Sequence, residues 1–309
     1  MRRLLPFLFL LAACSETPDE PRADERRPRL IVAGQLENAD LIETSGLARS
    51  QRDPQILWAH NDGGSKPRLF AFDFTGAHRG RLTLDDAKNR DWEDVASFEL
   101  DGEPWLLVAD IGDNDSKRKK VSFYVVAEPD LAADNKVRED SAWRVDFRYP
   151  DGPRDAEAVI VDTSNERVLI LSKRDLPPVL YSVPLRPSND RTVTATKLGT
   201  IESLPLPQRQ EVNQAYFTKD WHWQPTAMDL SADGRLAVIL TYRAVYVFRV
   251  DPGTDLRGAL SGRAFRLGLG NFRDAESAAF SADGRSIFVT LEGRHAPLLQ
   301  IDLEGGLPE

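Results

Sequence analysis

A short motif that recurs five times is the feature that most constrains the fold of this chain. Each copy has a polar residue, one spacer and a second polar residue, and then runs into a short apolar segment. The copies are residues 43–48, 91–96, 155–160, 224–229 and 274–279. Strand-rich units that repeat every 40 to 50 residues, roughly, are typical of β-propellers, in which each unit forms one blade.

The segments between the copies predict four short strands in most units. The expected strands are 45–48, 55–59, 68–74 and 79–84 in the first unit; 93–100, 105–110, 121–127 and 143–149 in the second; 157–162, 167–172, 179–184 and 193–200 in the third; 226–230, 235–241, 244–250 and 264–269 in the fourth; and 276–280, 286–291 and 298–303 in the fifth. Two near-identical Ser-Ala-Asp-Gly-Arg turns, at 231–235 and 281–285, fit tight hairpins.

The two ends of the repeat complement each other. The fifth unit lacks an outer strand, and the predicted strand 30–36 lacks a local partner. Pairing them would close the ring and protect both edges. The sequence therefore predicts an all-β fold, a single propeller over residues 30–309 with five four-stranded blades closed by the N-terminal strand.

Residues 202–223 show no alternating pattern, and we interpret them as a long loop, with a sixth blade as the alternative. The aromatic side chains of this segment would either cover the channel mouth or pack on the disc. They are Tyr216, Phe217, Trp221, His222 and Trp223.

The N-terminus has the features of a lipoprotein precursor. A basic start and a short apolar run lead to Leu11-Ala12-Ala13-Cys14, which matches the bacterial lipobox. We expect residues 1–13 to be a signal peptide, Cys14 to carry a lipid anchor to the membrane, and residues 14–29 to be a disordered tether. The expected location is the bacterial cell envelope, on the periplasmic face of the outer membrane. The alternative is an ordinary secretory signal with an unrelated cysteine.

The composition limits the classes of partner and cofactor that we expect. The formal net charge is −9, which argues against a nucleic-acid partner. The single cysteine excludes an intramolecular disulfide and a thiolate zinc cluster. An envelope protein or a small molecule remains as the expected partner.

Aligning the five copies places seven carboxylates in two layers, because the innermost strand of each blade lines the channel. The first layer holds Glu43, Asp91, Asp155, Gln224 and Asp274, and the second holds Ser45, Glu93, Glu157, Thr226 and Glu276. Carboxylates this close together raise one another's pKa or require a cation. Oxygen ligands without sulfur favour Ca²⁺ or Mg²⁺ over zinc or copper, and we expect Ca²⁺. The expected metal ligands are Asp91, Glu93, Asp155, Glu157, Asp274 and Glu276.

Two alternatives to a metal remain open. Lys173, Arg174 and Arg243 could neutralise the carboxylates by ion pairing. The carboxylates could also accept backbone N–H groups from neighbouring blades and so serve the fold alone. Loops 60–64 and 110–114 are rich in acidic and amide groups and would add oxygens under the metal hypothesis.

Several motifs resemble those of a family of uncharacterised bacterial secreted propellers. They are Ser45-Gly46-Leu47-Ala48, His60-Asn61-Asp62-Gly63-Gly64, Arg90-Asp91-Trp92-Glu93-Asp94, Asp110-Ile111-Gly112-Asp113-Asn114, Tyr149-Pro150-Asp151-Gly152 and Asp155-Ala156-Glu157-Ala158. More remotely the chain is similar to esterase-like phytases and to the strictosidine synthase, gluconolactonase and paraoxonase group. That resemblance implies a calcium ion in the central channel, although the inner-strand Asn ligands of that group are missing here.

Two functions follow from these observations. The first is a lipid-anchored binding or scaffold module with an acidic central channel. The alternative is a calcium-dependent hydrolase of esters, lactones or phosphoesters, with His60, Glu93 and Glu157 as candidate catalytic residues. The sequence contains no G-x-S-x-G nucleophile motif and no glycine-rich phosphate loop.

Overall fold

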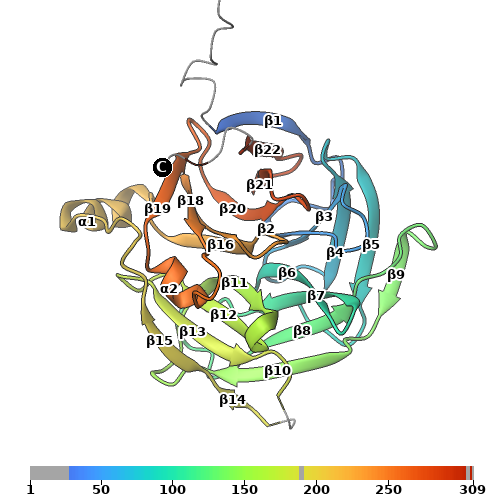
Figure 1. Ribbon diagram of the computed structural model, residues 1–309, viewed down its shortest axis with the longest axis horizontal. Coiled ribbons are helices and arrows are strands. Elements are labelled where there is room, and N and C mark those ends of the chain that lie inside the picture. Colours follow the sequence, from blue (N-terminus) through green and yellow to red (C-terminus); the bar gives the residue numbers. More distant parts are fainter. Residues whose placement is uncertain (1–27, 188–190, 304–306, 308–309) are drawn as a thin grey trace, which may run out of the picture.

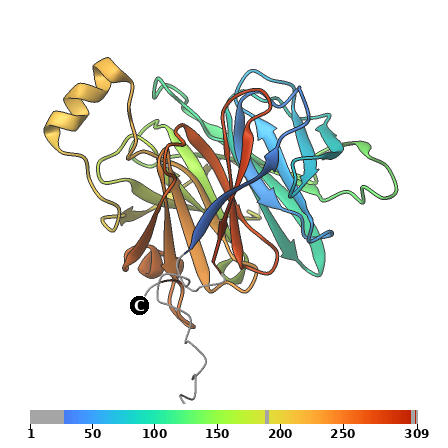
Figure 2. The ribbon, with the colours of Figure 1, turned by 90° about the horizontal axis from the view of Figure 1, so that it is seen from above.

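The computed structural model describes residues 28–187, 191–303 and 307. Five antiparallel sheets stand as blades around a central axis (Figure 1), and the disc is seen from its edge in Figure 2. The fold is the predicted five-bladed propeller, and the six-bladed alternative is wrong.

Each blade contributes its strands from the channel outward in chain order. Blade 1 is β2 (Thr44–Arg49), β3 (Ile56–Asn61), β4 (Arg68–Asp73) and β5 (His78–Leu84); blade 2 is β6 (Trp92–Leu100), β7 (Glu103–Asp110), β8 (Val121–Ala127) and β10 (Trp143–Arg148); blade 3 is β11 (Ala156–Asp162), β12 (Arg167–Ser172), β13 (Val179–Pro184) and β15 (Thr196–Thr200); blade 4 is β16 (Pro225–Leu230), β17 (Leu236–Thr241), β18 (Ala244–Arg249) and β19 (Ala264–Gly268); blade 5 is β20 (Ala275–Phe280), β21 (Ser286–Leu291) and β22 (Pro297–Asp302).

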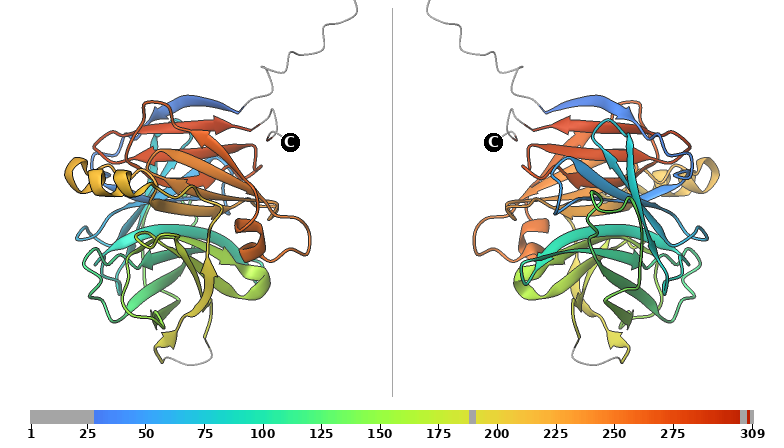
Figure 3. Two further views of the ribbon diagram at one scale, coloured as in Figure 1. Left: turned by 90° about the vertical axis from the view of Figure 1, so that its left-hand side faces the viewer. Right: turned by 90° about the vertical axis from the view of Figure 1, so that its right-hand side faces the viewer.

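The N-terminal strand closes the ring as predicted. β1 (Arg29–Gln35) pairs antiparallel with β22, with Leu30 opposite Ile301. Figure 3 shows these two strands side by side at one edge of the disc, with the blue strand against the red. The first and last parts of the chain therefore share one blade, and neither leaves an open edge.

Two details of the blades differ from the prediction. The predicted strand 193–200 is two strands: β14 (Val193–Thr194) adds parallel to blade 2, and only β15 belongs to blade 3. A further strand, β9 (Lys136–Glu139), adds parallel to blade 1 and was not predicted. The extra pairing arises because the connection between the third and fourth strands of blades 2 and 3 runs along the preceding blade.

The segment interpreted as a loop contains a helix, α1 (Arg209–Thr218), which begins with a capping box between Gln208 and Glu211. Figure 1 shows α1 at the rim of the disc, outside the inner strands, so it does not cover the channel. Phe217 is 89% exposed there, whereas Trp223 is buried. A second short helix, α2 (Leu256–Leu260), lies between β18 and β19.

Two further buried carboxylates of the inner strands hold neighbouring blades together. The Asp94 carboxylate accepts hydrogen bonds from the backbone N–H groups of Val95 and Val159, both at 2.9 Å. The Asp229 carboxylate accepts one from Phe280 at 2.8 Å. The structural role considered for the repeated carboxylates is thus filled by Asp94 and Asp229, which lie outside the two layers, and in part by Asp155 of the first layer, which accepts the backbone N–H group of Asp113 in blade 2 at 2.9 Å.

Candidate cation-binding site at the channel mouth

Every inner strand carries a β-bulge at the same point of the repeat. The pairing between the first two strands of each blade skips one residue near the start of the inner strand. The skipped residues are Ser45, Glu93, Glu157, Thr226 and Glu276, the whole second layer. A bulge turns a side chain out of the normal alternation of a strand, and bulges are frequent at functional sites. The bulge thus takes the second layer out of the regular alternation at the same point of all five inner strands.

The second strand of each blade adds a third layer that the sequence alignment missed. The residues that follow the equivalent strand ends are Asp62, Ile111, Lys173, Tyr242 and Glu292. Aligning the second strands in the same way as the first would have revealed this layer. It brings Asp62 and Lys173 into the site. Asp62 belongs to the loop 60–64, which was expected to add oxygens, and Lys173 is one of the cations expected to neutralise the carboxylates.

Two groups of carboxylates can each hold one cation. One consists of Asp62, Asp91 and Glu93, and the other of Glu93, Asp155 and Glu157; within each group the oxygens lie within 4.8 Å of one another. Two oxygens that bind one Ca²⁺ at about 2.4 Å are no further apart than about 4.8 Å. Because Glu93 belongs to both groups, they form one continuous acidic site on blades 1 to 3.

Glycines make room for these carboxylates. A Cβ atom on Gly112 would lie 1.9 Å from Glu93 Oε1, and a Cβ on Gly63 would lie 2.5 Å from Asp91 Oδ1. Any larger residue at these positions would displace the acidic side chains. The glycines of loops 60–64 and 110–114 therefore help to form the site.

Two basic side chains supply part of the compensating charge. Lys173 Nζ forms a buried ion pair with Glu157 and lies 5.1 Å from the centre of the Tyr242 ring. Arg174 Nε lies 2.6 Å from Asp155 Oδ2. Arg243 pairs instead with Asp220, at 2.6 Å, and does not join the site.

Four carboxyl groups of the two layers have raised pKa values despite the nearby cations. Burial, followed by the charge of Glu157, raises the pKa of Glu93 well above its usual range. Burial raises the pKa of Glu157 to about 7 even though Lys173 opposes the shift. The pKa of Asp91 is raised to about 6 by burial and by the neighbouring Asp62. Burial and Glu157 likewise hold the pKa of Glu276 well above its usual range.

One oxygen of the site has no partner. Glu157 is 4% exposed, and its Oε2 atom is buried without a hydrogen bond to any described residue, while Oε1 faces Lys173. A buried acceptor without a donor costs free energy of about 1–3 kcal/mol. A bound cation or a proton at Oε2 would remove that cost.

The remaining predicted residues lie in different surroundings. Glu43 and Asp274 are exposed and belong to neither group. His60 is fully buried: its Nδ1 atom lies 3.0 Å from the Asn61 carbonyl oxygen and its ring packs edge-on against Trp92. Burial lowers the pKa of His60, and a neutral imidazole between two blades is poorly placed to reach a substrate in the channel.

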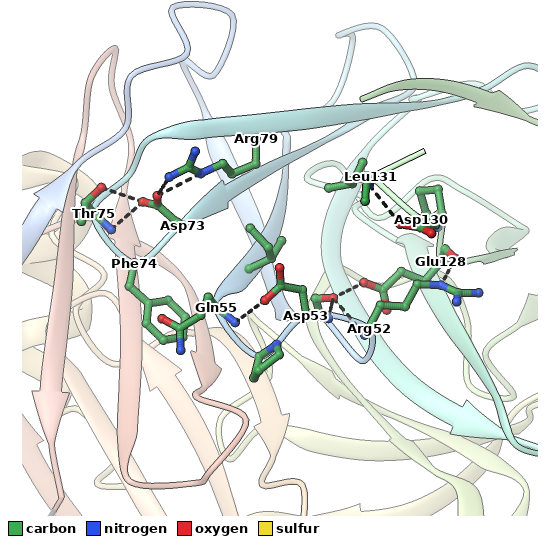
Figure 4. Close-up of a pocket in the computed structure, with 15 residues that line it drawn as sticks. Arg52, Asp53, Gln55, Asp73, Phe74, Thr75, Arg79, Glu128, Asp130 and Leu131 are labelled. Atoms are coloured by element: carbon green, nitrogen blue, oxygen red, sulfur yellow. Dashed lines mark hydrogen bonds and ion pairs between the residues drawn. The ribbon is translucent and has the colours of Figure 1, made fainter. Parts of the chain in front are cut away.

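A cavity of about 810 Å³ shares no lining residue with this site. It opens between the turns after β2 and β4 and the segment 128–132, and its residues are shown in Figure 4. Three of its carboxylates, those of Asp53, Asp73 and Asp130, accept the backbone N–H groups two residues ahead in their own turns. The fourth, Glu128, accepts the Gln51 backbone N–H and the Trp58 Nε1–H group of blade 1, both at 2.8 Å. Among the described residues that line this cavity, no three carboxylates lie close enough together to hold one ion, unlike those at the channel mouth.

Comparison with known proteins adds little beyond the fold. No protein-family model matches the chain, and no curated protein does. A solved structure with some similarity is the β-propeller domain of Cps50 (Swd1) from Myceliophteria thermophila, at 13% sequence identity and a TM-score of 0.40, over 86% of this chain and 67% of that one. Within the described residues, neither helix has the length and apolar character needed to span a membrane.

Proposed function

We propose that this chain is a binding module of the bacterial cell envelope, anchored through a lipid on Cys14, whose acidic channel mouth holds a Ca²⁺ ion. The observation that carries the proposal is the buried, unpartnered Glu157 Oε2 atom beside Glu93 and Asp155. Three carboxylates within reach of one ion match the oxygen ligands that Ca²⁺ prefers. Lys173 and Arg174 pair with Glu157 and Asp155, whereas Glu93 forms no ion pair with any described residue.

The first test is calorimetric titration of Ca²⁺ into the chain that lacks residues 1–13, after metal has been removed. We expect one ion per chain and weaker binding in Glu93→Gln, because Glu93 belongs to both carboxylate groups. Glu99→Gln, a change of the same chemistry at an exposed position at the far end of β6, is the matched control. Absence of binding in the unchanged chain, at calcium concentrations up to about 1 mM, would refute a cation site.

The membrane anchor is tested separately, because Cys14 and the segment 1–27 lie outside the described residues. We expect the full chain to partition into detergent and Cys14→Ser to remain in the aqueous phase. Ser15→Ala is the control. Equal partitioning of the two variants would contradict lipidation at Cys14.

A calcium-dependent hydrolase is the second candidate. It is favoured by one observation, the pKa of about 7 for Glu157, which suits a general base near neutral pH. A bound ion would polarise an ester or phosphate oxygen. The test is turnover of nitrophenyl esters, lactones and nitrophenyl phosphate with and without Ca²⁺. Loss of turnover in Glu157→Gln with calcium still bound would support this function, and no turnover of any substrate would argue against it.

A further inference from the structure

A cavity of about 530 Å³ at the junction of blades 1 and 2 has the opposite electrostatic character to the channel mouth. Its lining includes five basic residues, Lys88, Arg90, Arg118, Lys120 and Arg144, and two acidic ones, Asp86 and Asp110. Small-molecule sites usually have volumes of about 300–1,000 Å³. In a chain with a net charge of −9, such a concentration of cations favours an anionic ligand.

Arg118 is the fixed element of this cavity. Its side chain is 8% exposed, and its guanidinium donates to Asp110 Oδ1 at 2.7 Å and to the Gly112 carbonyl oxygen at 2.6 Å. Its Nε–H group is buried and has no acceptor among the described residues. A rigidly held donor without an acceptor is a position that a ligand oxygen would satisfy.

The other basic side chains exceed the acidic groups available to them. Lys120 and Arg144 share a single carboxylate, Asp146, at 2.6 and 2.8 Å. The Arg144 guanidinium also lies 5.0 Å from the centre of the Tyr124 ring, which keeps it at the cavity wall. When Asp146 is included, five cations face three carboxylates.

The rim of the cavity carries free positive charge. Lys88 and Arg90 are exposed and form no ion pair with any described residue. The Asp86 carboxylate is occupied by the backbone N–H and hydroxyl groups of Ser141. Neither rim cation is therefore neutralised by the acidic residue nearest to it in the sequence.

We propose that this basic pocket binds a compact polyanion, with one oxyanionic group accepting a hydrogen bond from Arg118 Nε and the remaining charge facing Lys88 and Arg90. Phosphate, sulfate and carboxylate groups share this chemistry. The pocket uses different side chains from the carboxylate site, so the proposal does not depend on calcium binding.

The test is calorimetric titration of pyrophosphate, inorganic phosphate, sulfate and citrate into the metal-free chain at constant ionic strength, without a carboxylate chelator that would itself compete. We expect one-to-one binding of at least one anion. The anion that binds most tightly distinguishes a phosphorylated, sulfated or polycarboxylate ligand.

The paired variant Lys88→Gln/Arg90→Gln should weaken that binding by about ten-fold or more, the loss expected when charge-assisted contacts are removed. Both residues are exposed, so the variant is expected to fold. Lys136→Gln, which removes an exposed charge on β9 away from the cavity, is the control. The proposal is overturned if no anion binds at concentrations up to about 5 mM, or if the paired variant and the control bind equally well.

Discussion

The pH dependence of stability offers a direct measure of the charge at the channel mouth. Burial raises the pKa of Glu157 from 4.5 to about 7. The folded chain therefore holds this proton more tightly than the unfolded chain does. Stability is greatest below the unfolded pKa and falls as the pH rises through the window between 4.5 and about 7.

The size of the effect follows from the two pKa values. Between pH 5 and pH 7.5, ionisation of Glu157 lowers the free energy of unfolding by about 2 kcal/mol. For a domain of this size, that corresponds to a fall in Tm of roughly 4–8 °C. Calcium bound at the site should restore the loss, since an ion at 100 times its Kd adds about 2.7 kcal/mol.

Comparison with Glu157→Gln reports the titration of Glu157 together with the part of the Glu93 and Glu276 shifts that its charge causes. The lowered pKa of the buried His60 changes stability in the opposite direction, but it does so equally in both proteins. We therefore expect the Tm of the unchanged chain, measured without metal by scanning calorimetry, to fall relative to Glu157→Gln as the pH rises from 5 to 7.5. Parallel curves would refute the reasoning, because they would mean that Glu157 titrates alike in the folded and unfolded chains.

Three further substitutions test separate parts of the structure. Lys173→Met should raise calcium affinity by about ten-fold or more, because it removes the cation that competes for the carboxylates, and calorimetric titration measures this. Asp94→Ala leaves two backbone N–H groups without an acceptor and should lower the free energy of unfolding by about 2–4 kcal/mol in urea titrations. Gly112→Ala places a methyl group against Glu93 and should weaken calcium binding, whereas Gly258→Ala, whose Cβ would meet its nearest neighbour at 3.4 Å, should not.

The architecture was predictable because local sequence patterns determine the strands and turns of each blade. Alternating apolar residues and Asp-Gly turns mark each strand within its own unit, and the unpaired first strand matched the incomplete last blade. The strands β9 and β14 were not predictable in this way. They are four and two residues long and pair with the preceding blade, so no local periodicity marks their partners.

The candidate site was predictable as a set of residues but not as an arrangement. The polar-spacer-polar repeat identified Asp91, Glu93, Asp155 and Glu157, which the structure brings together. The bulge at the second layer depends on the register of two strands, which a single strand does not reveal. The contribution of Lys173 depends in turn on the third layer, where one blade supplies a cation at the position that supplies Asp62 in another.

The two blades that lack an acidic residue in the second layer show what the fold itself requires there. Ser45 and Thr226 occupy the bulge in those blades, and each hydroxyl donates to a backbone carbonyl of an adjacent blade, at 3.0 and 2.8 Å. A hydroxyl is therefore sufficient to join neighbouring blades at this position. Glu93, Glu157 and Glu276 stand at the same bulge but bring buried charge, which the junction between blades does not need and which is costly without a counter-ion. The propeller fold therefore does not itself require these carboxyl groups; under the proposed function, the cation that they bind lies on blades 1 to 3, where both carboxylate groups are found.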